Sequence, residues 1–178
     1  MAGKGQAADP LAAGVTLRPL ESLSRVLLGC CAALSGAHAA GDEFSPQVWV
    51  NAGWLSYHFK RSEDIREDNI GLGAEVLIAP DHAITAGTYI NSYDETTYYG
   101  AYQWRPLHWQ PAGINVSMGV AIAALNGYPK IRNGGWFMAP LPLLCVEGRH
   151  FGANFTIIPE IADRVHGAIA VQIKLRVW

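Results

Sequence analysis

"GINVSMGVAIAA", residues 113–124, alternates large apolar residues with small or polar ones. Ile114, Met118 and Ile122 would share one face of an extended strand, and Asn115 and Ala123 the other. Because successive side chains of a strand point to opposite faces, this period of two predicts a β-strand with one apolar face. The same alternation runs through residues 69–79 and 169–177.

Segments of this kind recur along most of the chain. We place eight of them, at 47–59, 70–79, 82–91, 96–105, 112–124, 135–146, 149–158 and 165–178. An even number of strands of this length is typical of outer-membrane barrels, whose closure leaves no strand edge exposed to lipid. We therefore predict an all-β domain over residues 40–178, an eight-stranded antiparallel transmembrane β-barrel that is monomeric in a bacterial outer membrane. The alternative is a soluble periplasmic barrel or sandwich, which would carry polar residues on its outward faces.

The segment before the strands has the layout of a secretory signal peptide. Arg25 precedes a short apolar run, residues 26–34, and Ala37-His38-Ala39 offers a small-x-small cleavage site. We predict that residues 1–39 are cleaved on export; the alternative is a buried N-terminal helix. Cleavage would leave Cys145 as the one cysteine, so no internal disulfide is expected.

Charge and ligand spacing narrow the function classes. Residues 40–178 carry ten Lys and Arg against thirteen Asp and Glu, so the basic excess of a nucleic-acid-binding protein is missing. The His and Cys residues are scattered without metal-ligand spacing, and we expect neither a metal nor a cofactor.

The connections between strands differ in length in a regular way. Outer-membrane barrels have short periplasmic turns and longer extracellular loops, so residues 60–69, 92–97, 125–135 and 159–164 are expected at the extracellular face. His58 and the pair Asn91-Ser92 would then share the outer rim. Basic residues lie in or beside these loops, and we expect them to bind the phosphates of lipopolysaccharide: Arg61, Arg66, Lys130 and Arg132. A solvated crown of charged loops is the alternative.

Small residues dominate the face opposite the apolar one. Gly71, Gly73, Gly119 and Ala121 are predicted to face the lumen, where they would leave a narrow slot. The alternative is that they only ease the curvature of the barrel.

Several short stretches carry a family resemblance. They are "EDNIGLG" (67–73), "NS" (91–92), "WRPL" (104–107), "APLPLL" (139–144) and "TIIP" (156–159). In these stretches the chain resembles the lipid A palmitoyltransferase (PagP) family of eight-stranded outer-membrane enzymes. The resemblance implies transfer of a palmitoyl-type chain from a phospholipid to lipid A. It also implies lateral gates at Pro140, Pro142 and Pro159, and a slim apolar lumen that measures the acyl chain.

The family resemblance also implies a catalytic group at the outer surface, made of a His, an Asp and a Ser. His58 lies near the family's His and Ser92 falls on its Ser, while Asn91 stands where the family has its Asp. His58 would act as general base, and Ser92 as nucleophile or orienting donor. Asn91 or Asp94 is expected to orient the base. Asp94, or alternatively Glu67 or Asp68, would supply the missing carboxylate; otherwise the chemistry is altered or lost. A non-catalytic barrel with a lipid-binding or structural role is the alternative function.

Overall fold

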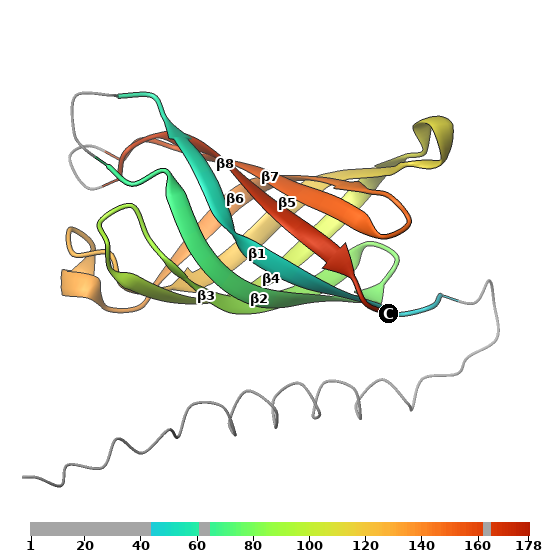
Figure 1. The fold of residues 1–178 in the computed structure, drawn as a ribbon, viewed down its shortest axis with the longest axis horizontal. Coiled ribbons are helices and arrows are strands. Elements are labelled where there is room, and N and C mark those ends of the chain that lie inside the picture. Colours follow the sequence, from blue (N-terminus) through green and yellow to red (C-terminus); the bar gives the residue numbers. More distant parts are fainter. Residues whose placement is uncertain (1–43, 61–64, 162–164) are drawn as a thin grey trace, which may run out of the picture. The chain divides into compact units, whose positions relative to one another are not determined.

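The computed structural model describes residues 44–60, 65–161 and 165–178, which form eight strands closed into a barrel (Figure 1). The strands are β1 (Gln47–His58), β2 (Asp68–Ala79), β3 (His82–Ile90), β4 (Thr96–Trp109), β5 (Asn115–Leu125), β6 (Phe137–Glu147), β7 (Phe151–Ile158) and β8 (Ala168–Arg176). Each strand is antiparallel to the next, and β8 closes the sheet on β1. The predicted eight-stranded antiparallel barrel is confirmed. The predicted signal peptide, residues 1–39, lies outside the described residues.

Two short 3-10 helices, η2 (Pro111–Gly113) and η3 (Arg132–Gly134), lie in the connections after β4 and before β6. Among the described residues, no helix has the length and apolar character needed to cross a membrane.

The strand β4 is longer than the sequence indicated. We expected this strand to end at residue 105, but β4 continues to Trp109 across an irregularity between Trp104 and Leu107. Gly119 on β5 permits this, because a Cβ at that position would collide with the Trp104 carbonyl. The backbone N–H of Arg105 donates to the Asp81 carbonyl at 2.7 Å. As a result, Arg105 is a buried residue within the strand and not its last residue.

The two faces of the sheet have opposite character. On β2, the outward side chains of Ile70 and Leu72 are 68% and 55% exposed, whereas inward Glu75 and Leu77 are buried. Other strands repeat the pattern, and their exposed large residues include Leu55, Ile84, Tyr102, Met118, Ile122, Ile169 and Ile173. The outside of the barrel is thus apolar and the inside holds most of its buried polar residues.

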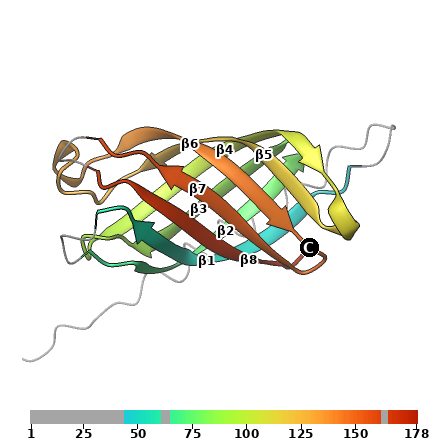
Figure 2. The same ribbon diagram turned by 90° about the horizontal axis from the view of Figure 1, so that it is seen from above.

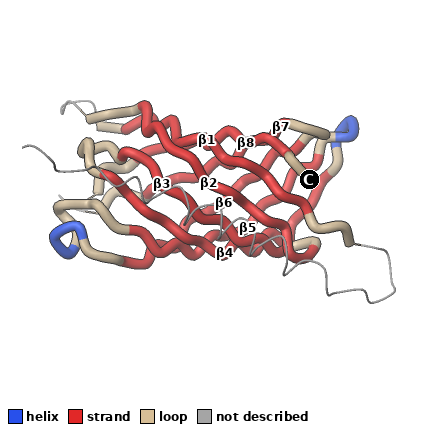
Figure 3. The backbone as a smooth tube through the Cα atoms, turned by 60° about the horizontal axis from the view of Figure 1, so that its bottom comes forward, coloured by secondary structure: helices blue, strands red, loops and turns tan. Residues whose placement is uncertain are grey.

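The two ends of the barrel are built differently. The connections after β1, β3, β5 and β7 gather at one end, which we call the loop end (Figures 2 and 3). The connections after β2, β4 and β6 lie at the other end together with the start of β1 and the end of β8. We call this the terminal end. The longest connections lie at the loop end and the shortest at the terminal end, as predicted, but the connections 91–95 and 110–114 have the same length.

Candidate functional site

Three neighbouring strands bring polar side chains together at the loop end. We call Ser56, His58, Asn69 and Ser92 the rim cluster. Asn69 joins Ser56 to Ser92: its Oδ1 accepts from Ser56 Oγ at 2.8 Å, and its Nδ2 donates to the Ile90 carbonyl at 3.0 Å and to Ser92 Oγ at 3.5 Å. Because β1, β2 and β3 are adjacent, the amide of Asn69 spans the distance from the first strand to the third.

His58 is the last residue of β1 and is 6% exposed. Its ring Nδ1 is buried and has no hydrogen-bond partner among the described residues. Its backbone N–H reaches Glu67 Oε1 at 3.5 Å, which places a carboxylate beside it. Within the described residues no hydrogen bond joins His58 to Ser92, so the two predicted catalytic residues share the rim without forming a preassembled pair.

Asn91 organises the turn between β3 and β4. Its Nδ2 donates to Thr97 Oγ1 at 3.0 Å and to the Gly127 carbonyl at 2.7 Å. Its Oδ1 accepts from the backbone N–H groups of Tyr93 at 2.8 Å and Glu95 at 3.2 Å. The amide is fully buried and uses both of its donor hydrogens and its acceptor oxygen in these bonds. This geometry gives Asn91 a structural role in the turn.

Two of the three acidic residues considered as substitutes for the family's Asp share one partner, Arg66. Asp94 has a positive φ of 61° in the turn and forms an ion pair with Arg66 Nε at 2.9 Å. Asp68 lies 3.7 Å from the same nitrogen. Glu67 is the one of the three that contacts His58, through the backbone bond above.

The basic residues predicted to bind phosphate lie in the loop-end connections, except Arg61, which falls outside the described residues. Arg66 is held by Asp68 and Asp94. Lys130 Nζ lies 5.6 Å from the centre of the Tyr93 ring, a cation–π distance. Arg132 donates to the Trp136 carbonyl at 3.1 Å. The three described residues come from two different connections, those after β1 and after β5.

The ladder between β6 and β7 is the shortest of the eight. It runs from the pair Leu143 and Thr156 to the pair Glu147 and Gly152, whereas β6 pairs with β5 along its whole length. Thr156 Oγ1 donates to the Pro142 carbonyl at 2.8 Å, and beyond that bond residues 137–142 have no ladder partner on β7. We call this unpaired stretch, with residues 157–159 opposite, the β6–β7 seam. Proline cannot donate a ladder hydrogen bond, and the seam begins where the prolines begin.

The small lumen residues lie on the predicted face but do not form an open slot. Gly73 and Gly87 make room for Tyr99, whose hydroxyl would be 2.5 Å and 2.9 Å from a Cβ added at these positions. Gly152 likewise leaves space for Lys174 and Trp49. Ala121 packs in a buried cluster with Leu143 and Cys145. The expectation of a slim apolar lumen is therefore wrong for the terminal half, because large and polar side chains fill the space that glycine leaves.

Four charged side chains meet inside the barrel, and sequence reasoning missed them. We call Glu75, Arg105, Glu147 and Lys174 the interior charge cluster. Lys174 Nζ lies 2.5 Å from Glu75 Oε1 and 2.6 Å from Glu147 Oε1, and Arg105 Nη1 lies 2.9 Å from Glu147 and 3.6 Å from Glu75. Glu75 and Lys174 already stood in the inward phase of their strands, which was the available signal. Glu147 gave none, because it was assigned to a turn, and Arg105 was placed at the very end of a predicted strand, where its facing was not clear.

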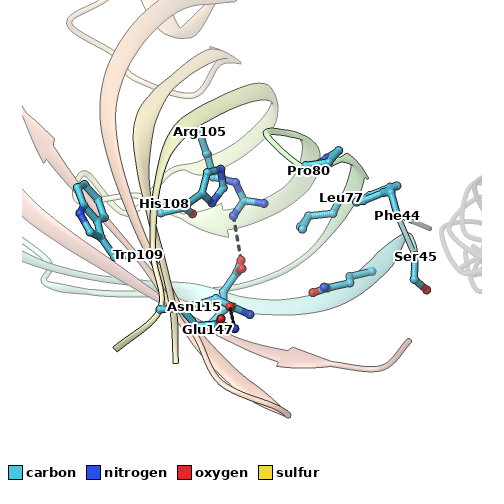
Figure 4. Close-up of a pocket in the computed structure, with 12 residues that line it drawn as sticks. Phe44, Ser45, Leu77, Pro80, Arg105, His108, Trp109, Asn115 and Glu147 are labelled. Atoms are coloured by element: carbon cyan, nitrogen blue, oxygen red, sulfur yellow. Dashed lines mark hydrogen bonds and ion pairs between the residues drawn. The ribbon is translucent and has the colours of Figure 1, made fainter. Parts of the chain in front are cut away.

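A cavity of about 500 Å³ opens at the terminal end and reaches this cluster (Figure 4). Its walls include Phe44, Leu77 and Pro80 on one side and Asn115 and Ser117 on another, with Arg105 and Glu147 at its inner end. Figure 4 shows the Arg105 side chain directed at the Glu147 carboxylate. In the part of the chain that the structure describes, no group of three or more His, Cys, Asp or Glu side chains is placed to bind a metal ion.

The fold and these sites define a closed, antiparallel eight-stranded barrel with an apolar exterior and a polar interior. No protein-family model matches the chain, and no curated protein matches it.

Proposed function

We propose that this protein is an integral outer-membrane barrel that transfers an acyl chain from a phospholipid to lipid A or a related outer-leaflet lipid. The membrane setting is supported by the exposed apolar side chains on the strands, since a band of outward apolar residues is what lipid requires of a barrel. With short turns in the periplasm, the loop end would face the cell exterior. The rim cluster and the basic loop residues would then meet lipopolysaccharide.

The observation that carries the acyl-transfer proposal is the β6–β7 seam. Residues 137–142 of β6 lack ladder bonds to β7 on the same half of the barrel as the rim cluster. At the seam Ala139 and Leu141 point inward while Pro140 and Pro142 point outward. A lipid chain passing between β6 and β7 would break no ladder hydrogen bond, and it would meet apolar side chains on the inner side. Pro159 ends the opposite flank of the seam, directly after β7.

In this proposal His58 carries the chemistry, because its ring Nδ1 forms no hydrogen bond with any residue that the structure describes. As general base, His58 removes the proton of the acceptor hydroxyl, and the resulting oxygen attacks the phospholipid ester carbonyl. The ester C–O bond breaks, and His58 returns the proton to the departing lysophospholipid oxygen. Glu67, one of the candidates to replace the family's Asp, would stabilise the imidazolium. Ser92 would orient the acceptor hydroxyl, since His58 and Ser92 are not bonded to one another.

A second function, a non-catalytic barrel that binds an acyl chain at the seam, is favoured by Asn91. Its amide is committed to the turn and cannot support a base. In this alternative the seam admits an acyl chain, and the hydrogen bonds of the rim cluster only stabilise the loop ends of β1, β2 and β3.

Lipid A mass spectrometry of a lipid A-producing host that expresses the chain distinguishes the two functions. Enzyme activity adds one acyl mass, and both His58→Ala and Ser92→Ala should remove it, His58→Ala by about 100-fold or more. Asp81→Asn, at the terminal end, is the matched control and should keep full activity. Unmodified lipid A in cells whose barrel is folded in the outer membrane would establish the non-catalytic function. Full activity of both rim variants would show that the site lies elsewhere.

A further inference from the structure

The polar residues inside the barrel form one connected column. From the interior charge cluster, Glu75 Oε2 accepts from Gln103 Nε2 at 3.1 Å and from Asn154 Nδ2 at 2.7 Å. Asn154 continues to Gln172 Oε1 at 3.5 Å, and Gln172 Nε2 donates to the Tyr99 hydroxyl at 3.2 Å. The column thus runs from the cavity at the terminal end to Tyr99 on the inner wall of the loop half.

The column also has hydrogen-bonding capacity that the protein does not use. Five buried atoms along it have no hydrogen-bond partner within the described part of the chain: Asn51 Oδ1, Gln103 Oε1, Arg105 Nε, Ser117 Oγ and Asn154 Oδ1. Buried polar atoms are normally paired, with protein or with water. Two of the five, on Arg105 and Ser117, belong to residues that line the cavity. Donors and acceptors spaced along a column are what water and hydrated ions need to pass from site to site.

The interior charge cluster blocks this column. Lys174 holds both carboxylates at once, at 2.5 Å and 2.6 Å, and Arg105 holds the same two at 2.9 Å and 3.6 Å. The interior of an eight-stranded barrel is just wide enough for side chains to fill, so four paired charged groups close it. Each carboxylate has a second cation, and Lys174 can leave one carboxylate without stranding either as an unpaired buried charge.

We propose that the interior column is an ion pathway, closed when Lys174 bridges Glu75 and Glu147 and opened when it releases one of them. The cluster holds two cations and two anions, so the closed state is balanced. A change in its charge sets the sign of the ions that pass. This inference rests on the proposed insertion in a membrane, and it is independent of acyl transfer.

Purified full-length protein in planar lipid bilayers with a KCl gradient tests the proposal through the reversal potential. The wild type should show rare, brief openings with little selectivity. Lys174→Gln leaves a net charge of −1 in the cluster and should raise the open probability about tenfold, with cation selectivity. Glu147→Gln leaves a net charge of +1 and should raise it similarly, with anion selectivity. Arg149→Gln, which removes a charge from the exposed β6–β7 turn, is the control and should match the wild type.

The double variant Lys174→Gln/Glu147→Gln covers the case in which a single variant fails to fold, because its cluster stays neutral. It should conduct more than the wild type, without selectivity. Heat-dependent gel mobility and circular dichroism establish that each protein is folded and inserted. Inserted variants that do not conduct, or single variants that share one sign of selectivity, overturn the ion pathway alone. A chain that stays in buffer and enters no membrane overturns the proposed function as well.

Discussion

At the scale of single residues, Asn91 shows how one side chain can define a connection. Its amide bonds the backbone of its own turn through Tyr93 and Glu95, and it bonds a different connection through Gly127. Asn and Asp both favour turns because their side chains bond nearby backbone groups. At position 91 only Asn fits, because its Nδ2 donates two hydrogen bonds and a carboxylate can only accept them.

Asn91→Asp should therefore destabilise the barrel and should not create a catalytic group. The new carboxylate would face the Gly127 carbonyl, which lies 2.7 Å from Nδ2 in the native protein, and would lose both donated bonds. We expect a loss of about 2–4 kcal/mol in the free energy of unfolding. Urea unfolding in lipid vesicles, followed by tryptophan fluorescence, measures it.

The matched control for this change is Asn126→Asp in the next loop-end connection. Asn126 Oδ1 accepts from the backbone N–H of Tyr98 at 2.8 Å, and a carboxylate can keep that bond. It should change the stability by less than about 0.5 kcal/mol. Equal losses in the two variants, or a gain in acyl transfer with Asn91→Asp, would refute the structural role of the Asn91 amide.

At the scale of elements, β6 is paired along its whole length with β5 but only from Leu143 to Glu147 with β7. The Pro142 carbonyl accepts from Thr156 on β7, so the nitrogen of Pro142 also faces β7. The backbone nitrogen of Pro140 faces β7 too, because residues two positions apart in a strand have the same orientation. Both missing N–H groups are therefore on the β7 side, while the ladder with β5 is complete.

Replacing both prolines by valine should extend the β6–β7 ladder and close the seam. Valine supplies the missing donors and favours strands, so we expect a gain of about 1–2 kcal/mol in the free energy of unfolding. If lipid enters at the seam, acyl transfer should fall at the same time. Unfolding in vesicles and lipid A mass spectrometry on the same variant measure the two effects. Pro106→Val, at a strand proline away from β7, is the control, and loss of transfer there too would separate activity from the seam.

The elements also show how far the sequence alone could predict this protein. The positions of the strands, and which of their side chains point inward, follow from a local period of two, and so all eight strands were predicted. The end of β4 was not, because the strand continues only where Gly119 on a neighbouring strand admits the Trp104 carbonyl. The interior charge cluster was missed for the same reason: Glu75 and Lys174 meet across a barrel closure that joins residues 99 positions apart. The rim residues were assigned to one end correctly, but the Asn91 bonds depend on turn geometry that no spacing reveals.

At the scale of the whole molecule, the closed barrel reverses the arrangement of a soluble globular protein, because its interior is polar and its exterior apolar. The buried interior holds Glu75, Arg105 and Lys174, each at most 1% exposed, while large apolar side chains cover the strands on the outside. A soluble barrel would present this apolar exterior to water. Lipid on the outside and a paired polar network on the inside satisfy both surfaces.

This arrangement predicts that one substitution on the exterior has different effects on stability in a membrane barrel and in a soluble barrel. Leu72 lies in the middle of β2 with its side chain outward and 55% exposed. Leu72→Arg should cost about 2–4 kcal/mol of folding free energy in lipid vesicles, because a charge near the bilayer midplane is unfavourable. In a soluble barrel the same change would be neutral, since the side chain would remain in water.

Val177 provides the comparison, because it is also 55% exposed but follows the end of β8 at the terminal end. Val177→Arg should cost no more than about 1 kcal/mol, as expected near a membrane interface. Urea titrations of both variants in vesicles of matched composition measure the difference. If Leu72→Arg folds in vesicles as well as the wild type, or either protein reaches its native state in buffer without lipid or detergent, the exterior does not face a bilayer. In that case the seam could not receive a membrane lipid, and the interior column could not conduct ions between two compartments. The comparison of Leu72→Arg with Val177→Arg therefore tests the premise of both proposals, whereas a substitution at the rim tests acyl transfer alone.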